Sequence, residues 1–201
     1  MLAKLLDIKN NFTEITELAK QNNTKVIMAK EGDVFTVKES FQNTFSNSYK
    51  GAKNNLLKES EDITFSVLSP ASDTYSGDSN ACSLVVLVSL HEGNILLMGD
   101  SDSLAEKKVI SYLNTCNDIY SKDKSNDLIT KISVLQSAHH GSSKNTNSEE
   151  FIQSIDPRIA VISCGFNNSY GHPHEETLEI FEKENVVIKR TDYDGCISIF
   201  P

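Results

Sequence analysis

From residue 62 onward, short apolar runs alternate with stretches whose apolar residues recur at helical spacing. The apolar runs have the length of β-strands and lie at 63–70, 81–90, 94–100, 131–137, 158–165, 186–191 and 196–200. Helical periodicity occupies 103–114, 148–155 and 175–184. This alternation predicts an α/β fold with helices packed on a sheet, and we expect a single domain over 1–201.

Turn and cap residues refine the ends of these elements. The sequence HEGN at 91–94 predicts a tight turn between two buried strands, and DYDG at 192–195 predicts a second hairpin turn. Ser103 is predicted to be a helix N-cap, with Glu106 three residues later completing a capping box. The expected core positions are Leu84, Val86, Val88, Leu96 and Ile132.

The first sixty residues are less regular. The spacing of apolar residues predicts a helix over 14–23, followed by two short strands at 25–30 and 34–37. Residues 39–61 are polar and almost without periodicity. We expect this segment to be a long surface loop or an insertion.

Composition and charge narrow the functional classes. The formal net charge of -9 argues against an extended basic groove for nucleic acid, although bound cations can reverse the field at a site. No apolar stretch approaches the ~20 residues of a membrane span, and the first apolar run is too short for a signal peptide, so we expect a cytoplasmic chain. The 4 cysteines lack metal-site or disulfide spacing and are expected to be reduced and mostly buried.

Side chains that can bind a metal ion follow three of the predicted strands. Asp100 ends one strand, His139 and His140 follow the next, and His172 lies in the loop after 158–165. Strand ends in an α/β protein meet at one edge of the sheet, so we expect these side chains to converge on zinc or manganese. Alternatively, Asp100 accepts backbone hydrogen bonds at a turn and the paired histidines are exposed.

The sequence YGHPHEET at 170–177 contains two histidines one residue apart. Pro173 and the glutamates after it suit the first turn of a helix, so His174 is predicted to face solvent there. His172 precedes the proline in an extended conformation and is predicted to point over the rim of the loop.

Acidic residues near the C-terminus allow two interpretations. A hairpin turn explains Asp192 and Asp194, although Thr191 and Asp192 could reach the same rim as the histidines if the sheet order permits it. The sequence has no G-x-S-x-G motif, which argues against a serine hydrolase.

The order of these motifs resembles a known family. The chain is similar over roughly residues 15–200 to the metallo-β-lactamase-like domain of the ComEC family of DNA-uptake competence proteins. The matching motifs are NILLMGD, SAHHGSSKN, PRIAVISCG, NNSYGHPHEETLE and IKRTDYDGCISI. The resemblance implies that Asp100 bridges two metal ions, that His139 or His140 is a metal ligand, and that His172 lies at the rim of the active site.

The resemblance lacks one motif. Domains of that family begin with an H-x-H-x-D-H sequence that supplies most of the metal ligands, and this chain has no such sequence before Asp100. HPHEET at 172–177 differs from that motif at its last two positions and comes after the other motifs. We therefore expect a partial metallo-β-lactamase-like αββα sandwich with an incomplete metal site.

Two functions follow as expectations. The first is a metal-dependent hydrolase, with phosphodiesters or DNA as substrate, in which Asp100, His140 and His172 are catalytic and Asp100, His139 and His140 bind zinc or manganese. The second is a non-catalytic fragment or interaction module that keeps the sheet without the chemistry. A third possibility is assembly with a partner chain that supplies the missing half of the fold.

Overall fold

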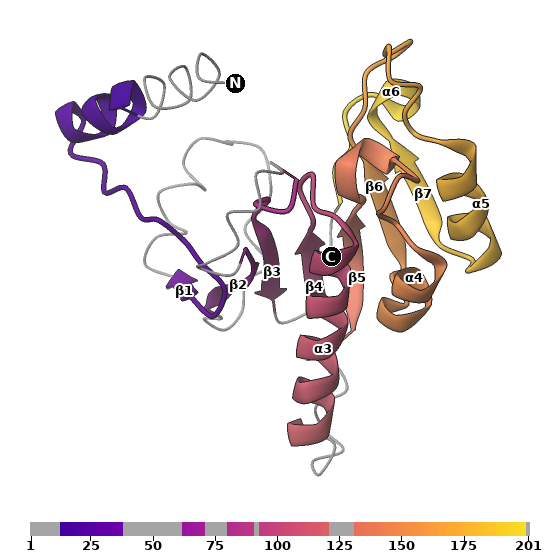
Figure 1. The fold of residues 1–201 in the computed structure, drawn as a ribbon, viewed down its shortest axis with the longest axis horizontal. Coiled ribbons are helices and arrows are strands. Elements are labelled where there is room, and N and C mark those ends of the chain that lie inside the picture. Colours follow the sequence, from indigo (N-terminus) through magenta and orange to yellow (C-terminus); the bar gives the residue numbers. More distant parts are fainter. Residues whose placement is uncertain (1–12, 38–61, 71–79, 91–92, 121–130, 200–201) are drawn as a thin grey trace, which may run out of the picture.

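The computed structural model describes residues 13–37, 62–70, 80–90, 93–120 and 131–199 (Figure 1). Within these residues, seven strands form one sheet whose spatial order follows the order of the chain. The strands are β1 (Val34–Val37), β2 (Ile63–Ser69), β3 (Val85–Leu90), β4 (Gly93–Leu97), β5 (Ile132–Gln136), β6 (Ile159–Ile162) and β7 (Val187–Arg190). Neighbours from β1 to β4 are antiparallel, and those from β4 to β7 are parallel.

Three helices pack on one face of this sheet. They are α3 (Ser103–Tyr120), α4 (Glu149–Ile155) and α5 (Glu175–Lys183), and a single turn, α6 (Thr191–Asp194), follows β7 (Figure 1). The core joins apolar side chains of the helices to those of the strands, and among its members are Val85, Leu96, Met98, Val109, Leu135, Phe151, Ile152, Ala160, Ile162 and Phe181. The predicted α/β class with helices packed on a sheet is confirmed. None of the described helices is both long and apolar enough to cross a membrane.

The core prediction was correct at three positions and inaccurate at two. Val88, Leu96 and Ile132 are buried, but Val86 is half-buried and Leu84 precedes β3 with 47% of its surface exposed. Side chains alternate between the two faces of a strand, and the helix-facing positions of β3 belong to its odd-numbered residues. The continuous apolar run at 84–88 carries no alternation from which to choose the face.

The opposite face of the sheet is also apolar. Strand register places Val86 opposite Leu97 and, two residues along, Val88 opposite Ile95. Val88 is buried, whereas Leu97 is exposed, as is Val187 on β7. This second face is therefore covered unevenly.

The N-terminal predictions had mixed outcomes. Residues 13–21 are helical and β1 forms as expected, but residues 25–30 form no strand. Val26, Ile27 and Met28 are exposed there, and high β-propensity alone does not make a strand without a neighbouring strand to pair with. The predicted loop at 39–61 and the centre of the 91–94 turn lie outside the described residues.

The start of α3 differs from the predicted capping box. Asp102 is the cap, because its Oδ1 accepts hydrogen bonds from the backbone N–H groups of Leu104 at 3.0 Å and Ala105 at 3.4 Å. Ser103 is the first helical residue, and Glu106 is buried and bonded to another part of the chain. The predicted cap at Ser103 was therefore one residue too late.

The cysteine prediction was half correct. All four thiols are free, as expected. None is buried, however: Cys82 and Cys196 are exposed, and Cys116 and Cys164 are half-buried. Apolar sequence neighbours therefore did not indicate the burial of these side chains.

Candidate functional site

The parallel strands β4 to β7 end at the same edge of the sheet. Asp100 lies three residues after β4, His139 and His140 follow β5, and His172 lies in the loop after β6. The His139 N–H donates to the Gly99 carbonyl at 2.8 Å, which ties the first two loops together. The structure thus brings together all four side chains that the sequence singled out.

His140 and Asp100 face one another directly. The His140 Nε2 atom lies 3.4 Å from Asp100 Oδ1, and both side chains are about half exposed. The other ring nitrogen, Nδ1, lies 2.6 Å from the Ser163 carbonyl, which can only accept, so Nδ1 carries a proton. In the neutral ring Nε2 then presents a lone pair to the carboxylate. A proton on Nε2 would make this contact an ion pair, and in its absence a bound cation would satisfy both acceptors.

The His139 ring lies near the rings of His140 and His172. Its ring centroid is 6.3 Å from that of His140 and 5.6 Å from that of His172, and its Nδ1 is 3.5 Å from the Asn80 side-chain nitrogen. Both paired histidines have positive φ, 48° and 57°. Residues other than glycine adopt this left-handed region at a cost in energy, so the surrounding structure must hold them there.

A buried asparagine that the sequence analysis missed holds this turn. The Asn147 side chain accepts from the Ser137 hydroxyl and the Ala138 N–H, and donates to the carbonyls of Ala138 and Ser142. Its four bonds span 2.7 to 3.2 Å, so one amide fixes the backbone on both sides of His139 and His140. No sequence pattern distinguishes Asn147 from the many other asparagines of this chain.

The Gln136 side chain holds the backbone of the loop that carries Asp100 by hydrogen bonds. Its side-chain oxygen accepts from the N–H groups of Met98 at 3.0 Å and Gly99 at 2.9 Å. It is the last residue of β5, so the strand that leads to the histidines also fixes the backbone that leads to Asp100. Sequence analysis missed this residue as well, because the contact joins segments 37 or more residues apart.

His172 lies between two other rings. Its ring stacks on Tyr170 at 5.8 Å and on His140 at 6.3 Å, with interplanar angles of 22° and 24°. Burial lowers the pKa of His172, and the nearby charges of the other histidines and Lys144 lower it further. The neutral imidazole, which can bind a metal ion or accept a proton, is therefore favoured.

Asn168 fixes the loop that carries His172. Its side-chain oxygen accepts from the His172 N–H at 3.0 Å, and its amide donates to the carbonyls of His172 at 2.6 Å and Gly165 at 2.9 Å. Three bonds from one side chain close the loop on itself. The backbone on which His172 sits is thereby held without help from secondary structure.

Gly141 joins the two histidine loops. Its φ is 81°, and a Cβ atom there would come 2.6 Å from the Pro173 Cβ, so only glycine allows this approach. Its carbonyl also accepts from the His174 N–H at 3.0 Å. The backbone therefore turns sharply at Gly141, directly after the paired histidines.

His174 does not face solvent as predicted. It is the N-cap of α5 and half-buried, and its Nδ1 accepts from the Ser143 N–H at 3.0 Å and lies 3.0 Å from the Ser143 hydroxyl. The prediction treated the helix start in isolation, whereas the loop before α4 supplies partners for the ring. His174 therefore fastens the two loops rather than extending into water.

We expect His174→Ala to lower the free energy of unfolding by about 1 to 2 kcal/mol, because both bonds to Ser143 are lost. His174→Asn should lose less, since asparagine places an acceptor at the same cap position. Urea unfolding monitored by circular dichroism checks both values. Equal stability of wild type and His174→Ala would show that the ring holds nothing in place.

Residues after β7 reach the same edge of the sheet. The Thr191 hydroxyl bonds to the backbone of Cys164, accepting from its N–H at 2.9 Å and donating to its carbonyl at 2.8 Å. Asp192 pairs with Arg190 at 2.8 Å, and this pairing lowers the pKa of the carboxyl. Residues 196–199 form no strand, so the hairpin interpretation was wrong and the alternative, a position at the rim, is correct.

A pocket opens beside the histidines. It has a volume of about 300 Å³ and is lined by His140, Ser163, Cys164, Gly165, Asn168, Tyr170 and His172. Burial raises the pKa of the Cys164 thiol, and the neighbouring Asp192 raises it further, so this thiol is not activated as a nucleophile. Within the pocket, the groups suited to proton transfer or metal binding are therefore the imidazoles of His140 and His172.

The side chains fit a metal ion only in part. Asp100 and the His140 Nε2 are suitably placed to share one ion, and a carbonyl bond to the second ring nitrogen is usual for a metal-bound histidine. Yet over 13–37, 62–70, 80–90, 93–120 and 131–199 there is no group of three or more such side chains that could hold an ion. Further ligands would have to come from outside these residues.

Comparison with known proteins relates the chain to competence proteins. It is 29% identical over 184 residues to "ComE operon protein 3" of Bacillus subtilis, a match that covers 92% of this chain and 19% of that protein. It is 28% identical to "Recombination protein 2" of Haemophilus influenzae over 68% of the chain, and 28% identical to "Competence protein ComA" of Neisseria gonorrhoeae over 67%. These matches cover 15% and 17% of the two proteins, so the chain spans less than a fifth of each of these three relatives. No family model matches the chain.

Proposed function

We propose that this chain carries part of a metal-dependent phosphodiesterase site. The observation that supports it most is the pair of facing acceptors, Asp100 Oδ1 and His140 Nε2, 3.4 Å apart at the carboxyl edge of a parallel sheet. A bound cation would satisfy both. When present, zinc or manganese would polarise a phosphoryl group and lower the pKa of a bound water toward neutrality.

Different residues of this chain would bind the cation, transfer a proton and hold the loops in position. Asp100 and His140 bind the cation, with His139 as a further ligand candidate one residue away. His172, whose pKa is lowered by burial and by neighbouring positive charges, lines the pocket and would donate to or accept from the scissile oxygen. Asn147 and Asn168 hold the two histidine loops in position.

The proposal requires further ligands, and we propose that they come from residues outside those described or from a partner chain. The second face of the sheet suits such an arrangement, because it is apolar and unevenly covered, with Leu97 and Val187 exposed. Covering it with a second sheet would produce the αββα sandwich of the metallo-β-lactamase fold. Relatives more than five times as long as the matched region leave room for that second layer.

The competence proteins among the relatives suggest the substrate. We propose DNA as the natural phosphodiester, which suits relatives named for recombination and for competence. A formal charge of -9 does not suit broad contact with a phosphate backbone, so binding would rely on local contacts, with the metal acting at the scissile phosphate.

Metal binding tests the proposal without requiring turnover. We expect isothermal titration with Zn²⁺ or Mn²⁺ to show binding that His140→Ala weakens by about 10- to 100-fold. His139→Ala is the matched variant, and it should weaken binding less, because the His139 ring is not the one that faces Asp100. The reverse order would transfer the ligand role to His139.

The second candidate function is a non-catalytic interaction module. It is favoured by the lack of a third metal-binding side chain near Asp100 and His140 among the described residues. Absence of any metal binding by the wild-type chain, together with no cleavage of bis-p-nitrophenyl phosphate, would support this function over the hydrolase.

A further inference from the structure

Three aromatic side chains are strongly exposed beside the histidine cluster. Phe166 and Tyr170 are each 78% exposed and Tyr193 is 88% exposed, more than any other large hydrophobic side chain of the described residues. Phe166 and Tyr170 lie in the loop after β6, and Tyr193 lies on α6 after β7. Exposed rings on neighbouring loops at one edge of a sheet are a candidate binding surface.

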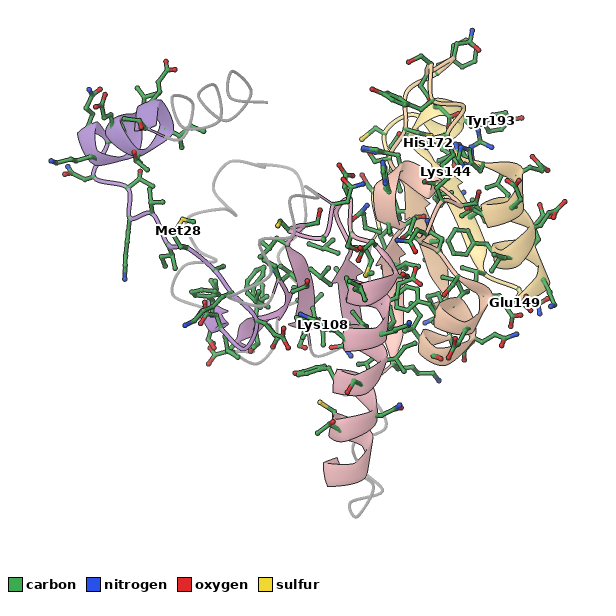
Figure 2. All side chains as sticks on the ribbon, viewed as in Figure 1. Met28, Lys108, Lys144, Glu149, His172 and Tyr193 are labelled. Atoms are coloured by element: carbon green, nitrogen blue, oxygen red, sulfur yellow. The ribbon has the colours of Figure 1, made fainter. Side chains whose placement is uncertain are left out.

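Of these three residues, which we call the aromatic rim, Tyr170 and Tyr193 are connected to the site through neighbouring residues. The Tyr170 ring stacks on His172, which stacks on His140, and Asp100 lies directly beyond. The helical turn that carries Tyr193 is fixed to the pocket wall through the bonds between Thr191 and Cys164. Figure 2 shows Tyr193 and His172 at the same end of the molecule.

The stack leaves one position open. Tyr170 contacts His172 on one side, and with 78% of its surface exposed it has a flat, apolar face available to a ligand. The loop beneath is held by the three bonds of Asn168, so the ring is presented on a fixed backbone. A planar ligand on Tyr170 would extend the row of rings that leads to Asp100.

We propose that the aromatic rim binds unpaired nucleobases, so that the site takes single-stranded rather than double-stranded nucleic acid. A base stacked on Tyr170 places its own backbone beside the pocket, and Phe166 and Tyr193 receive neighbouring bases. Bases inside a duplex have both faces covered by their neighbours and cannot stack on a protein ring. This inference rests on the proposed phosphodiesterase function for its biological meaning, but the binding itself needs no metal.

Electrostatics near the rim favour stacking over phosphate contact. Arg190 is already paired with Asp192, and Asp100 and Asp194 add negative charge at the same edge. Lys144 is exposed and acts electrostatically on His172, and Figure 2 places it at the same end of the molecule. We therefore expect the logarithm of the dissociation constant to change with that of salt concentration by a slope of only ~1 or less.

The test measures binding of fluorescein-labelled oligothymidylate by anisotropy, with the full chain and with EDTA present so that cleavage and metal binding play no part. Tyr170→Leu should weaken binding by roughly 10-fold, because it keeps an apolar side chain but removes the ring. Tyr112→Leu, on α3, is the matched control and should leave binding unchanged. The chain has no tryptophan, so quenching of tyrosine fluorescence by the unlabelled oligonucleotide, reduced in Tyr170→Leu, gives a second readout.

Two competitors make the test decisive. An abasic oligomer of the same length keeps the phosphates but should compete poorly, as should a blunt duplex. Equal competition by the abasic oligomer, or unchanged affinity of Tyr170→Leu, would overturn the inference and leave the rim to a protein partner. Because EDTA is present throughout, failure of the metal site would not affect this result, and failure of stacking would not affect the metal titration.

Discussion

Asp100→Ala is expected to reduce metal-dependent cleavage of bis-p-nitrophenyl phosphate by the isolated chain by at least about 100-fold. The Asp100 carboxylate faces His140 Nε2 at 3.4 Å, and among the described residues no third side chain completes a metal site with them. Removing one of two ligands leaves the imidazole alone, which lowers both occupancy of the ion and the fixed geometry that stabilises a transition state. Wild-type turnover should itself be slow for the same reason.

Two variants control for this result. Asp100→Asn keeps the shape and one oxygen but removes the charge, so its activity should lie between those of wild type and Asp100→Ala. Asp62→Ala removes an exposed carboxylate just before β2 and should leave the rate unchanged. Robust metal-dependent turnover that persists in Asp100→Ala would refute the role assigned to this carboxylate.

Glu106→Ala is expected to lower the free energy of unfolding by about 2 to 4 kcal/mol. The carboxylate lies on α3, 2% exposed, and accepts from the Ser148 hydroxyl at 2.7 Å, the Ser148 N–H at 3.3 Å and the Thr146 hydroxyl at 3.4 Å. Alanine would remove the acceptor of the buried Thr146 hydroxyl and of the exposed Ser148, and would leave the buried space of the carboxylate empty. Because Ser148 caps α4 and follows the histidine loop, the metal affinity of His140 and Asp100 should fall as well.

Glu106→Gln separates the hydrogen bonds from the charge. It keeps the volume and one acceptor, so its cost should be about 1 kcal/mol or less. Burial raises the pKa of the Glu106 carboxyl above its ordinary value of 4.5, and the hydrogen bonds of Ser148 oppose this only in part. The folded state therefore holds its proton to higher pH than the unfolded state does.

The sign of the pH dependence follows from this shift. As pH rises from 4.5 toward the higher pKa of the folded state, the unfolded carboxyl ionises first, so the wild type loses stability relative to Glu106→Gln. Urea unfolding of both proteins at pH 4.5 and pH 7 measures the difference. An advantage of wild type over Glu106→Gln that grew with pH would contradict the raised pKa.

Sequence periodicity was sufficient for most of the fold. Strands β2 to β7 and helices α3 to α5 lie where apolar spacing predicted them. Each of these elements buries one face, so its apolar residues recur with the period of the strand or helix. The strand predicted at 25–30 is not formed, nor is the strand predicted at 196–200 over its described residues 196–199, since a strand forms only beside a partner and that partner is not encoded locally. The face of β3 that packs against the helices could not be predicted, because the apolar run at 84–88 has no alternation of apolar and polar residues.

Residue type and local spacing were enough to predict the α/β class and the placement of Asp100, His139, His140 and His172 after strand ends. That His140 faces Asp100 and that His174 connects two loops became known only from the packed structure. It alone also gave Gln136, Asn147 and Glu106 their roles. These contacts join segments distant in the chain, and a side chain's partners there depend on how strands and helices pack, which no local pattern records.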